Sequence, residues 1–194
     1  MIVGFMHIPK TGGSAVGYTV ERHPGTMIFT HRRDAIGEAV SFKEHKGTFL
    51  FAFMRNPFDR LVSAYAYLKA GGISEDDALD ARQYVEPYED FEHFVLEGIA
   101  SGASMSQIHL RPQTFWISDA LDNIIADFIG RFERLQEDFD EVCEMTGIKR
   151  KKLPVTRTSE HRPYREYYGN EAVQDVVRSV YARDFEVGEY PTEL

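Results

Sequence analysis

The sequence predicts an α/β protein in which a mainly parallel sheet is covered by helices on both faces. Three observations lead to this fold class. First, short apolar segments alternate with helical patterns. Second, the first apolar segment is followed directly by a glycine-containing turn. Third, an Asn-Pro pair that follows a later apolar segment marks the start of a helix. We expect residues 1–194 to form one domain, because neither an internal repeat nor a linker is visible.

The expected strands are short and apolar, as is typical of strands buried on both faces. They cover residues 2–8, 26–30, 48–54 and 124–132. The expected helices have apolar residues at helical spacing or clear end signals, and they cover residues 15–22, 35–42, 57–70, 88–99, 135–146 and 171–183. The acidic segment 73–87 is expected to be a surface loop and segment 148–163 a basic loop.

Composition and charge exclude several classes of protein. The net charge of −9, from 22 basic and 31 acidic residues, argues against a nucleic-acid-binding surface but leaves room for a small basic pocket. Cys143 is the single cysteine, so an internal disulfide cannot form. No apolar stretch approaches the roughly 18 residues of a membrane span, and the N-terminus lacks the basic region of a signal peptide. These features predict a cytoplasmic location and do not indicate an oligomeric state.

A glycine turn between the first strand and helix has the form of a phosphate-binding loop. Its glycines let backbone N–H groups point at one anion, and the following helix adds its positive N-terminal end. Its lysine precedes the glycines, unlike the GxxxxGK[ST] order of ATP- and GTP-binding loops. A turn with an exposed lysine would also explain the pattern. The candidate ligand-binding residues are Lys10, Thr11, Gly12, Gly13 and Ser14.

A second candidate segment joins the third strand to its helix. Arg55 ends the strand, Asn56 and Pro57 begin the helix, and Ser63 lies about two turns into it. An arginine and a hydroxyl together suit a terminal phosphate. A well-capped helix with Arg60 in a salt bridge would explain Asn56 and Pro57 but not Arg55 and Ser63.

Together these segments resemble the PAPS-dependent sulfotransferases. Residues 7–14 are similar to that family's 5′-phosphosulfate loop and residues 53–65 to its 3′-phosphate motif, in the order and at the separation that the family has. The branch that looks most similar contains the heparan sulfate 2-O- and chondroitin sulfotransferases. Segments 111–113, 129–133, 164–168 and 181–185 are also family-like, more weakly. The resemblance implies a P-loop-like three-layer fold, PAPS as sulfuryl donor, PAP as product and no metal.

Sulfuryl transfer to a hydroxyl by in-line displacement needs two catalytic roles, which we assign by analogy with phosphoryl transfer. Lys10 stabilises the leaving phosphate, and His31 is the general base, since imidazole titrates near neutrality and the residue follows the second strand. The family's fuller His-Gly-His pattern is not present around His31. Asp34 and Glu38 are alternative bases, and His109 and His161 are weaker candidates, in loops that could face a ligand.

The remaining expectations concern the basic loop and the substrates. Arg162 and Tyr164 are candidates to contact the 3′-phosphate or the adenine, although a solvated basic turn explains them nearly as well. The acceptor is expected to be a hydroxyl of a carbohydrate or glycoconjugate. A nucleotide-dependent kinase and a non-catalytic nucleotide- or glycan-binding module are the competing hypotheses.

Overall fold

A computed structural model describes residues 2–30, 34–155 and 160–194. The chain forms two compact units. Unit 1 contains Met1–Arg55 and Gln113–Arg157, and unit 2 contains Asn56–Pro112 and Thr158–Leu194. The boundary between Arg55 and Asn56 therefore falls inside the second candidate segment.

Unit 1 is built on one sheet in which every neighbouring pair of strands is parallel. Within the described residues the sheet has four strands in the order β2-β1-β3-β4. The strands are β1 (Val3–Met6), β2 (Thr26–Phe29), β3 (Phe49–Met54) and β4 (Phe128–Arg131). The first three expected strands are confirmed, with shorter ends.

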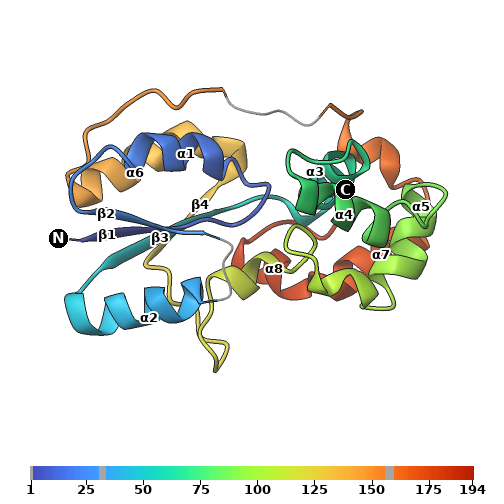
Figure 1. The fold of residues 1–194 in the computed structure, drawn as a ribbon, viewed down its shortest axis with the longest axis horizontal. Coiled ribbons are helices and arrows are strands. Elements are labelled where there is room, and N and C mark those ends of the chain that lie inside the picture. The colour runs from blue at the N-terminus through green and yellow to red at the C-terminus, as the bar shows by residue number, and fades with distance from the viewer. Residues whose placement is uncertain (1, 31–33, 156–159) are drawn as a thin grey trace. The chain divides into compact units, whose positions relative to one another are not determined.

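Helices cover both faces of this sheet, which confirms the three-layer α/β architecture. In Figure 1, α1 (Gly13–Val20) and α6 (Leu135–Thr146) lie on one face and α2 (Ala35–Lys46) on the other. The short helices η3 (Gln113–Trp116) and η4 (Phe132–Arg134) complete unit 1. Side chains alternate across β1, so the two layers bury different residues of the same strand.

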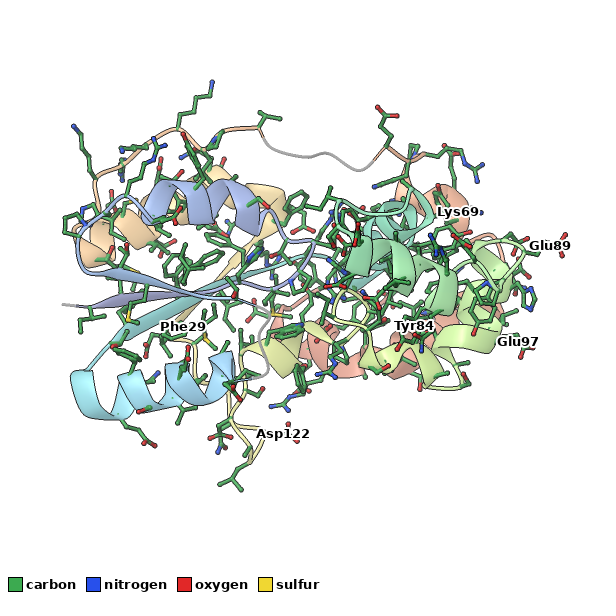
Figure 2. All side chains as sticks on the ribbon, in the orientation of Figure 1. Phe29, Lys69, Tyr84, Glu89, Glu97 and Asp122 are labelled. Carbon is green, nitrogen blue, oxygen red and sulfur yellow. The ribbon has the colours of Figure 1, made fainter. Side chains whose placement is uncertain are left out.

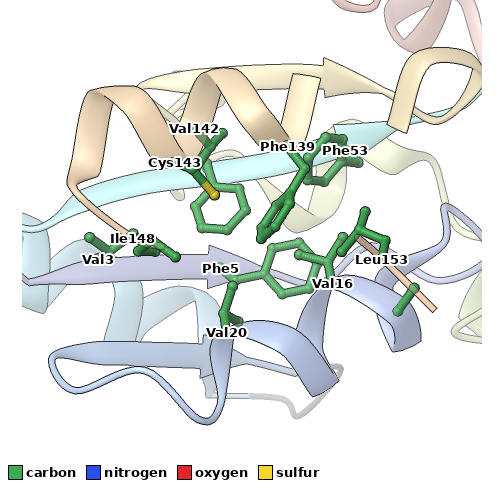
Figure 3. Packing of buried hydrophobic residues seen from close by; sticks show 12 residues of the cluster. Val3, Phe5, Val16, Val20, Phe53, Phe139, Val142, Cys143, Ile148 and Leu153 are labelled. Carbon is green, nitrogen blue, oxygen red and sulfur yellow. The ribbon is translucent and has the colours of Figure 1, made fainter. Parts of the chain in front are cut away.

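The core between the sheet and the α1–α6 layer is aromatic and aliphatic (Figure 3). Phe5 of β1 stacks on Phe51 of β3 with ring centroids 5.1 Å apart, and Phe139 of α6 packs in the same cluster. Burial in this core raises the pKa of the Cys143 thiol to about 11, with the charge of Asp140 as a smaller cause. On the opposite face, the ring centroid of Phe29 (labelled in Figure 2) lies 6.1 Å from the ring centroid of Phe42 in α2.

Unit 2 is helical in its described residues. Its first helix, α3, begins where the Asn-Pro pair predicts, since the Asn56 side chain accepts a hydrogen bond from the Phe58 N–H at 2.9 Å. The elements are α3 (Pro57–Lys69), α4 (Glu75–Tyr84), α5 (Phe91–His93), the π-helix η1 (Phe94–Ile99), η2 (Ala103–Ser106), η5 (Tyr164–Tyr167), α7 (Glu171–Val180) and α8 (Ala182–Val187).

An aromatic cluster holds unit 2 together. Phe58 of α3 meets Tyr168 and Phe185 with ring centroids 4.9 and 5.1 Å away. The Tyr168 hydroxyl donates to the Phe58 carbonyl at 2.8 Å. The Tyr181 hydroxyl donates to the carbonyl of Leu110 at 2.7 Å. Buried hydroxyls with such partners fasten the C-terminal residues to α3 and to the segment before Pro112.

Segment 73–87 was predicted to be a loop, and this prediction is wrong. Residues Glu75–Tyr84 form helix α4, because Ser74 and Asp77 make a capping box and three acidic residues occupy the first turn. The Asp77 carboxylate also accepts from the Tyr67 hydroxyl at 2.7 Å, which ties the helix start to α3. At its other end, Tyr84 (Figure 2) bonds Ser106 at 3.0 Å.

Three other expected elements differ from the structure by more than a shift of their ends. The fourth strand begins at Phe128 rather than residue 124, because Ile124 forms an antiparallel bridge with Ser118. The helix expected over 88–99 is the short helix α5 followed by the π-helix η1, which covers the second half of that range. The last expected helix is two helices that meet at Tyr181.

No helix in the described ranges is both long and apolar enough to cross a membrane.

Candidate functional site

The candidate site in unit 1 is the loop between β1 and α1. Lys10 has a φ of 69° and Gly12 a φ of 78°, so the chain turns through two left-handed residues before α1 begins at Gly13. A left-handed conformation is costly for lysine and routine for glycine. The loop therefore has two left-handed residues, which is more than the start of a helix by itself requires.

Both glycines of the loop have neighbours that leave no room for a side chain. A Cβ on Gly13 would lie 1.9 Å from Cδ2 of His7, and one on Gly12 would lie 2.7 Å from a methyl carbon of Leu135. The His7 ring is itself stacked on the Phe5 ring, with centroids 5.6 Å apart, so it has little freedom to move away from Gly13. Gly12 and Gly13 thus permit a close approach of the loop to His7, which follows β1, and to Leu135 of α6.

The start of α1 offers backbone donors to an anion. The first N–H groups of a helix have no acceptor within the helix, and they carry the positive end of its dipole. Ser14 is exposed at this helix start. Thr11 is fully buried and its hydroxyl donates to the Ile8 carbonyl at 3.0 Å, so in this conformation its hydroxyl stabilises the loop.

Arg55 lies against this loop. It follows the last residue of β3, and β3 is the neighbour of β1, so their carboxyl ends meet at one sheet edge. Its guanidinium Nη1 donates to the Lys10 carbonyl at 3.2 Å, and its Cζ lies 4.2 Å from the centroid of the Phe132 ring. The structure thus brings together the two unit 1 parts of the predicted site, the loop and Arg55.

Gln113 was not predicted as a site residue, yet it holds Arg55 by its main chain. The Arg55 N–H donates to Gln113 Oε1 at 2.8 Å, and Gln113 Nε2 donates to the Arg55 carbonyl at 2.9 Å. The Gln113 side chain is completely buried. Its place in a family-like segment was the one sequence signal that pointed to it.

The predicted base and its alternatives come from different parts of the chain. His31 lies outside the described residues. Asp34 and Glu38 are exposed at the start of α2. His109 belongs to unit 2, where it is buried and its Nδ1 lies 3.0 Å from Nε2 of Gln107.

Three other predicted ligand-binding residues belong to unit 2. Ser63 is buried in α3, with 2% of its surface exposed. Arg162 is exposed, and its guanidinium carbon lies 5.0 Å from the Tyr167 ring centroid. Tyr164 is half-buried, and the centroid of its ring lies 5.5 Å from the guanidinium carbon of Arg165. Their roles as ligands stay predictions.

Comparison with models of protein families identifies the family of this chain. The model of the sulfotransferase family matches residues 3–191, which is nearly the whole chain. The chain belongs to the sulfotransferase family. The matched range includes both the β1–α1 loop and the residues around Arg55.

Two individual proteins are similar to this sulfotransferase. An uncharacterized protein of Archaeoglobus fulgidus is 27% identical over 124 residues, which are 58% of this chain and 79% of that protein. The crystal structure of a sulfotransferase from Alicyclobacillus acidocaldarius is 16% identical, with a TM-score of 0.41, and the match covers 95% of this chain and 92% of that one.

Proposed function

We propose that this protein transfers a sulfuryl group from PAPS to a hydroxyl of a carbohydrate or glycoconjugate. In that reaction a bond forms from the acceptor oxygen to sulfur, the bond from sulfur to the 5′-phosphate oxygen breaks, PAP leaves, and the acceptor proton passes to a base. Family membership supports sulfuryl transfer in general. The identity of the donor, the acceptor and the residue roles are part of the proposal.

The observation that carries the proposal is the loop with Arg55 against it. Gly12 and Gly13 carry no side chains, so the loop packs closely on His7 and Leu135, and the first N–H groups of α1 are proposed to face the 5′-phosphate and sulfate. Arg55 adds a fixed guanidinium at the same sheet edge through its hydrogen bond to the Lys10 carbonyl. Such a set of donors suits a ligand with several anionic groups.

Lys10 is proposed to stabilise the leaving phosphate. Lys10 belongs to the loop and is half-buried, and its positive charge would offset the negative charge that develops as the sulfur–oxygen bond breaks. His31 is proposed as the base that takes the acceptor proton, with Asp34 or Glu38 as alternatives. Thr11 is proposed to bind through its backbone, and Ser14 through its hydroxyl. Ser63, Arg162 and Tyr164 are proposed donor-binding residues of unit 2.

Calorimetric titration with PAP tests the donor, with ATP·Mg²⁺ titrated in parallel. We expect PAP to bind and ATP·Mg²⁺ to bind far more weakly. Arg55→Ala should weaken PAP binding about 100-fold, or about 2.7 kcal/mol, because a charge-assisted hydrogen-bond donor is lost. Preference for ATP·Mg²⁺, or no binding of either nucleotide, would overturn the proposed donor.

Arg22→Ala is a matched control for this measurement. Arg22 also lies over an aromatic ring, with its Cζ 4.2 Å from the centroid of Tyr18, but it follows the C-terminal end of α1, away from the loop. It should leave PAP affinity unchanged. Turnover then separates an enzyme from a binding module, since Lys10→Ala should lose sulfuryl transfer while it still folds.

A further inference from the structure

The hydrogen bonds between Gln113 and Arg55 replace those of a neighbouring strand. In the register of β3 with β4 the last pair is Met54 with Arg131, so Arg55 comes directly after the paired residues. The Gln113 amide reaches both polar groups of the Arg55 main chain, at 2.8 and 2.9 Å. A primary amide has both a donor and an acceptor, which makes it suited to this double contact.

These two hydrogen bonds continue the main-chain hydrogen bonding of β3 by one residue, to Arg55. Gln113 lies in the short helix η3 and is fully buried, so its side chain has little freedom. With its main chain held, Arg55 has only its side-chain torsions left to set. The Lys10 carbonyl, at 3.2 Å, and the Phe132 ring, at 4.2 Å, then hold the guanidinium against the loop.

We propose that Gln113 is a positioning residue of the donor site, which presets the Arg55 guanidinium for the nucleotide by clamping the Arg55 main chain. This inference rests on the proposed function, in which Arg55 binds PAPS. Gln113 itself is not assigned a contact with the donor. Gln113 acts through Arg55. Because the Arg55 side chain is ordered before the ligand binds, binding does not have to include the entropic cost of ordering it.

A merely structural role is the alternative, and Gln136 provides the matched control. Gln136, in α6 of the same unit, accepts from the Leu153 N–H at 2.7 Å and donates to the Lys151 carbonyl at 3.2 Å. It therefore holds a main-chain segment with the same chemistry as Gln113. Its bonds go to residues 151 and 153 rather than to the loop or Arg55.

The test compares Gln113→Met and Gln136→Met in the full chain. Methionine has a similar volume but cannot make the two hydrogen bonds. NMR relaxation of the Arg55 Nε–Hε group, measured without ligand, reports the order of the guanidinium on the picosecond-to-nanosecond scale. PAP titration of both variants, of Arg55→Ala and of the double variant Arg55→Ala/Gln113→Met reports whether the effect passes through Arg55.

We expect Gln113→Met to lower the order of the Arg55 side chain and to weaken PAP binding about tenfold. In the Arg55→Ala background the same substitution should change PAP affinity less than about twofold, because the residue that it positions is gone. Gln136→Met should lower the melting temperature and leave both readouts unchanged. If Gln113→Met does not fold, Gln113→Asn keeps the amide one methylene short of both bonds and should show the same pattern.

Either of two results would overturn the inference. One is an Arg55 side chain as ordered in Gln113→Met as in the wild type. The other is a loss of PAP affinity in the double variant equal to the sum of the two single losses. If the wild-type protein binds no PAP, the proposed function fails, and the ligand-free order of Arg55 still decides whether Gln113 positions it.

Discussion

Arg55 and Arg60 come from one short segment of the sequence, but their surroundings differ. Arg55 follows β3 in unit 1, is half-buried and lies against the β1–α1 loop through the Lys10 carbonyl. Arg60 lies in α3 of unit 2 with 1% of its surface exposed, and its Nη2 donates to the Arg111 carbonyl. The first arginine borders the candidate site, whereas the second is part of the interior of a helical unit.

The difference shows that a motif can combine a binding residue with a folding residue. A strand end at the carboxyl edge of a parallel sheet is where ligands bind in α/β proteins. A helix interior position five residues later faces whatever packs on that helix, here the segment that contains Arg111. We therefore expect substitutions at the two arginines to affect different properties.

The largest effect is expected for Arg60→Ala on the free energy of unfolding. The substitution leaves a cavity and removes the donor to the Arg111 carbonyl, which should cost about 3 kcal/mol. Arg55→Ala should cost less than about 1 kcal/mol, since it removes a half-buried side chain from the site edge. Urea unfolding of both variants measures the difference.

Arg60→Met keeps most of the side-chain volume and serves as a control for the cavity. It should recover part of the lost stability. A greater loss of stability in Arg55→Ala than in Arg60→Ala would contradict the division of roles between the two arginines.

A smaller effect is expected for Gly13→Ala in the loop. The new methyl would meet the His7 ring, 1.9 Å away, so the loop or the ring must shift. Overpacking of this kind should cost about 2 kcal/mol, and PAP affinity should fall at least tenfold because the backbone donors move. Thermal unfolding and calorimetry measure the two quantities.

Gly17→Ala, in the interior of the same helix, is the matched control. A Cβ there would lie 3.6 Å from the Ile28 side chain, an ordinary contact. Alanine should therefore stabilise α1 by about 0.5–1 kcal/mol and leave PAP affinity unchanged. Equal losses of affinity in the two alanine variants would show that the contact with His7 is unimportant.

The smallest effect is expected for Tyr181→Phe in unit 2, and it should depend on pH. Burial raises the pKa of Tyr181 above its usual value, and the nearby positive charge of Arg60 only partly offsets this. At pH 8 the loss of the hydrogen bond to Leu110 should cost about 1 kcal/mol. Above the usual tyrosine pKa of about 10 the unfolded wild type ionises while the folded form does not, so wild-type stability falls with rising pH.

The two stability curves should therefore converge between about pH 10 and 11. Urea unfolding at several pH values measures the convergence. A constant difference across this range would contradict the raised pKa of Tyr181.

The sequence predicted unit 1 better than unit 2. The strands of unit 1 are short apolar runs and its turns are marked by glycine, so local pattern and fold agree. Helix α4 was missed because four of its ten residues are acidic and only Asp77 and Ala81 are buried, so it shows little apolar periodicity. The Ser74–Asp77 capping box was the local signal that could have identified it.

The same contrast applies to the candidate site. The loop from Lys10 to Ser14 and Arg55 were found from local patterns, because glycine pairs and strand ends are properties of contiguous residues. Thr11 was predicted as a ligand-binding residue, yet its hydroxyl donates to the Ile8 carbonyl, a partner that depends on how the loop closes. The role of His31 stays a prediction, as do those of Ser63, Arg162 and Tyr164.

The sequence by itself determined the fold class, the family and the position of the loop, since each depends on periodicity and motifs that short segments carry. Only the tertiary structure decided that Gln113, 58 positions from Arg55 along the chain, holds its main chain. It also decided that His7 closes on Gly13 and that Arg60 is buried. Such contacts depend on where distant segments meet, because a side chain's hydrogen-bond partner is set by packing and not by its neighbours in sequence.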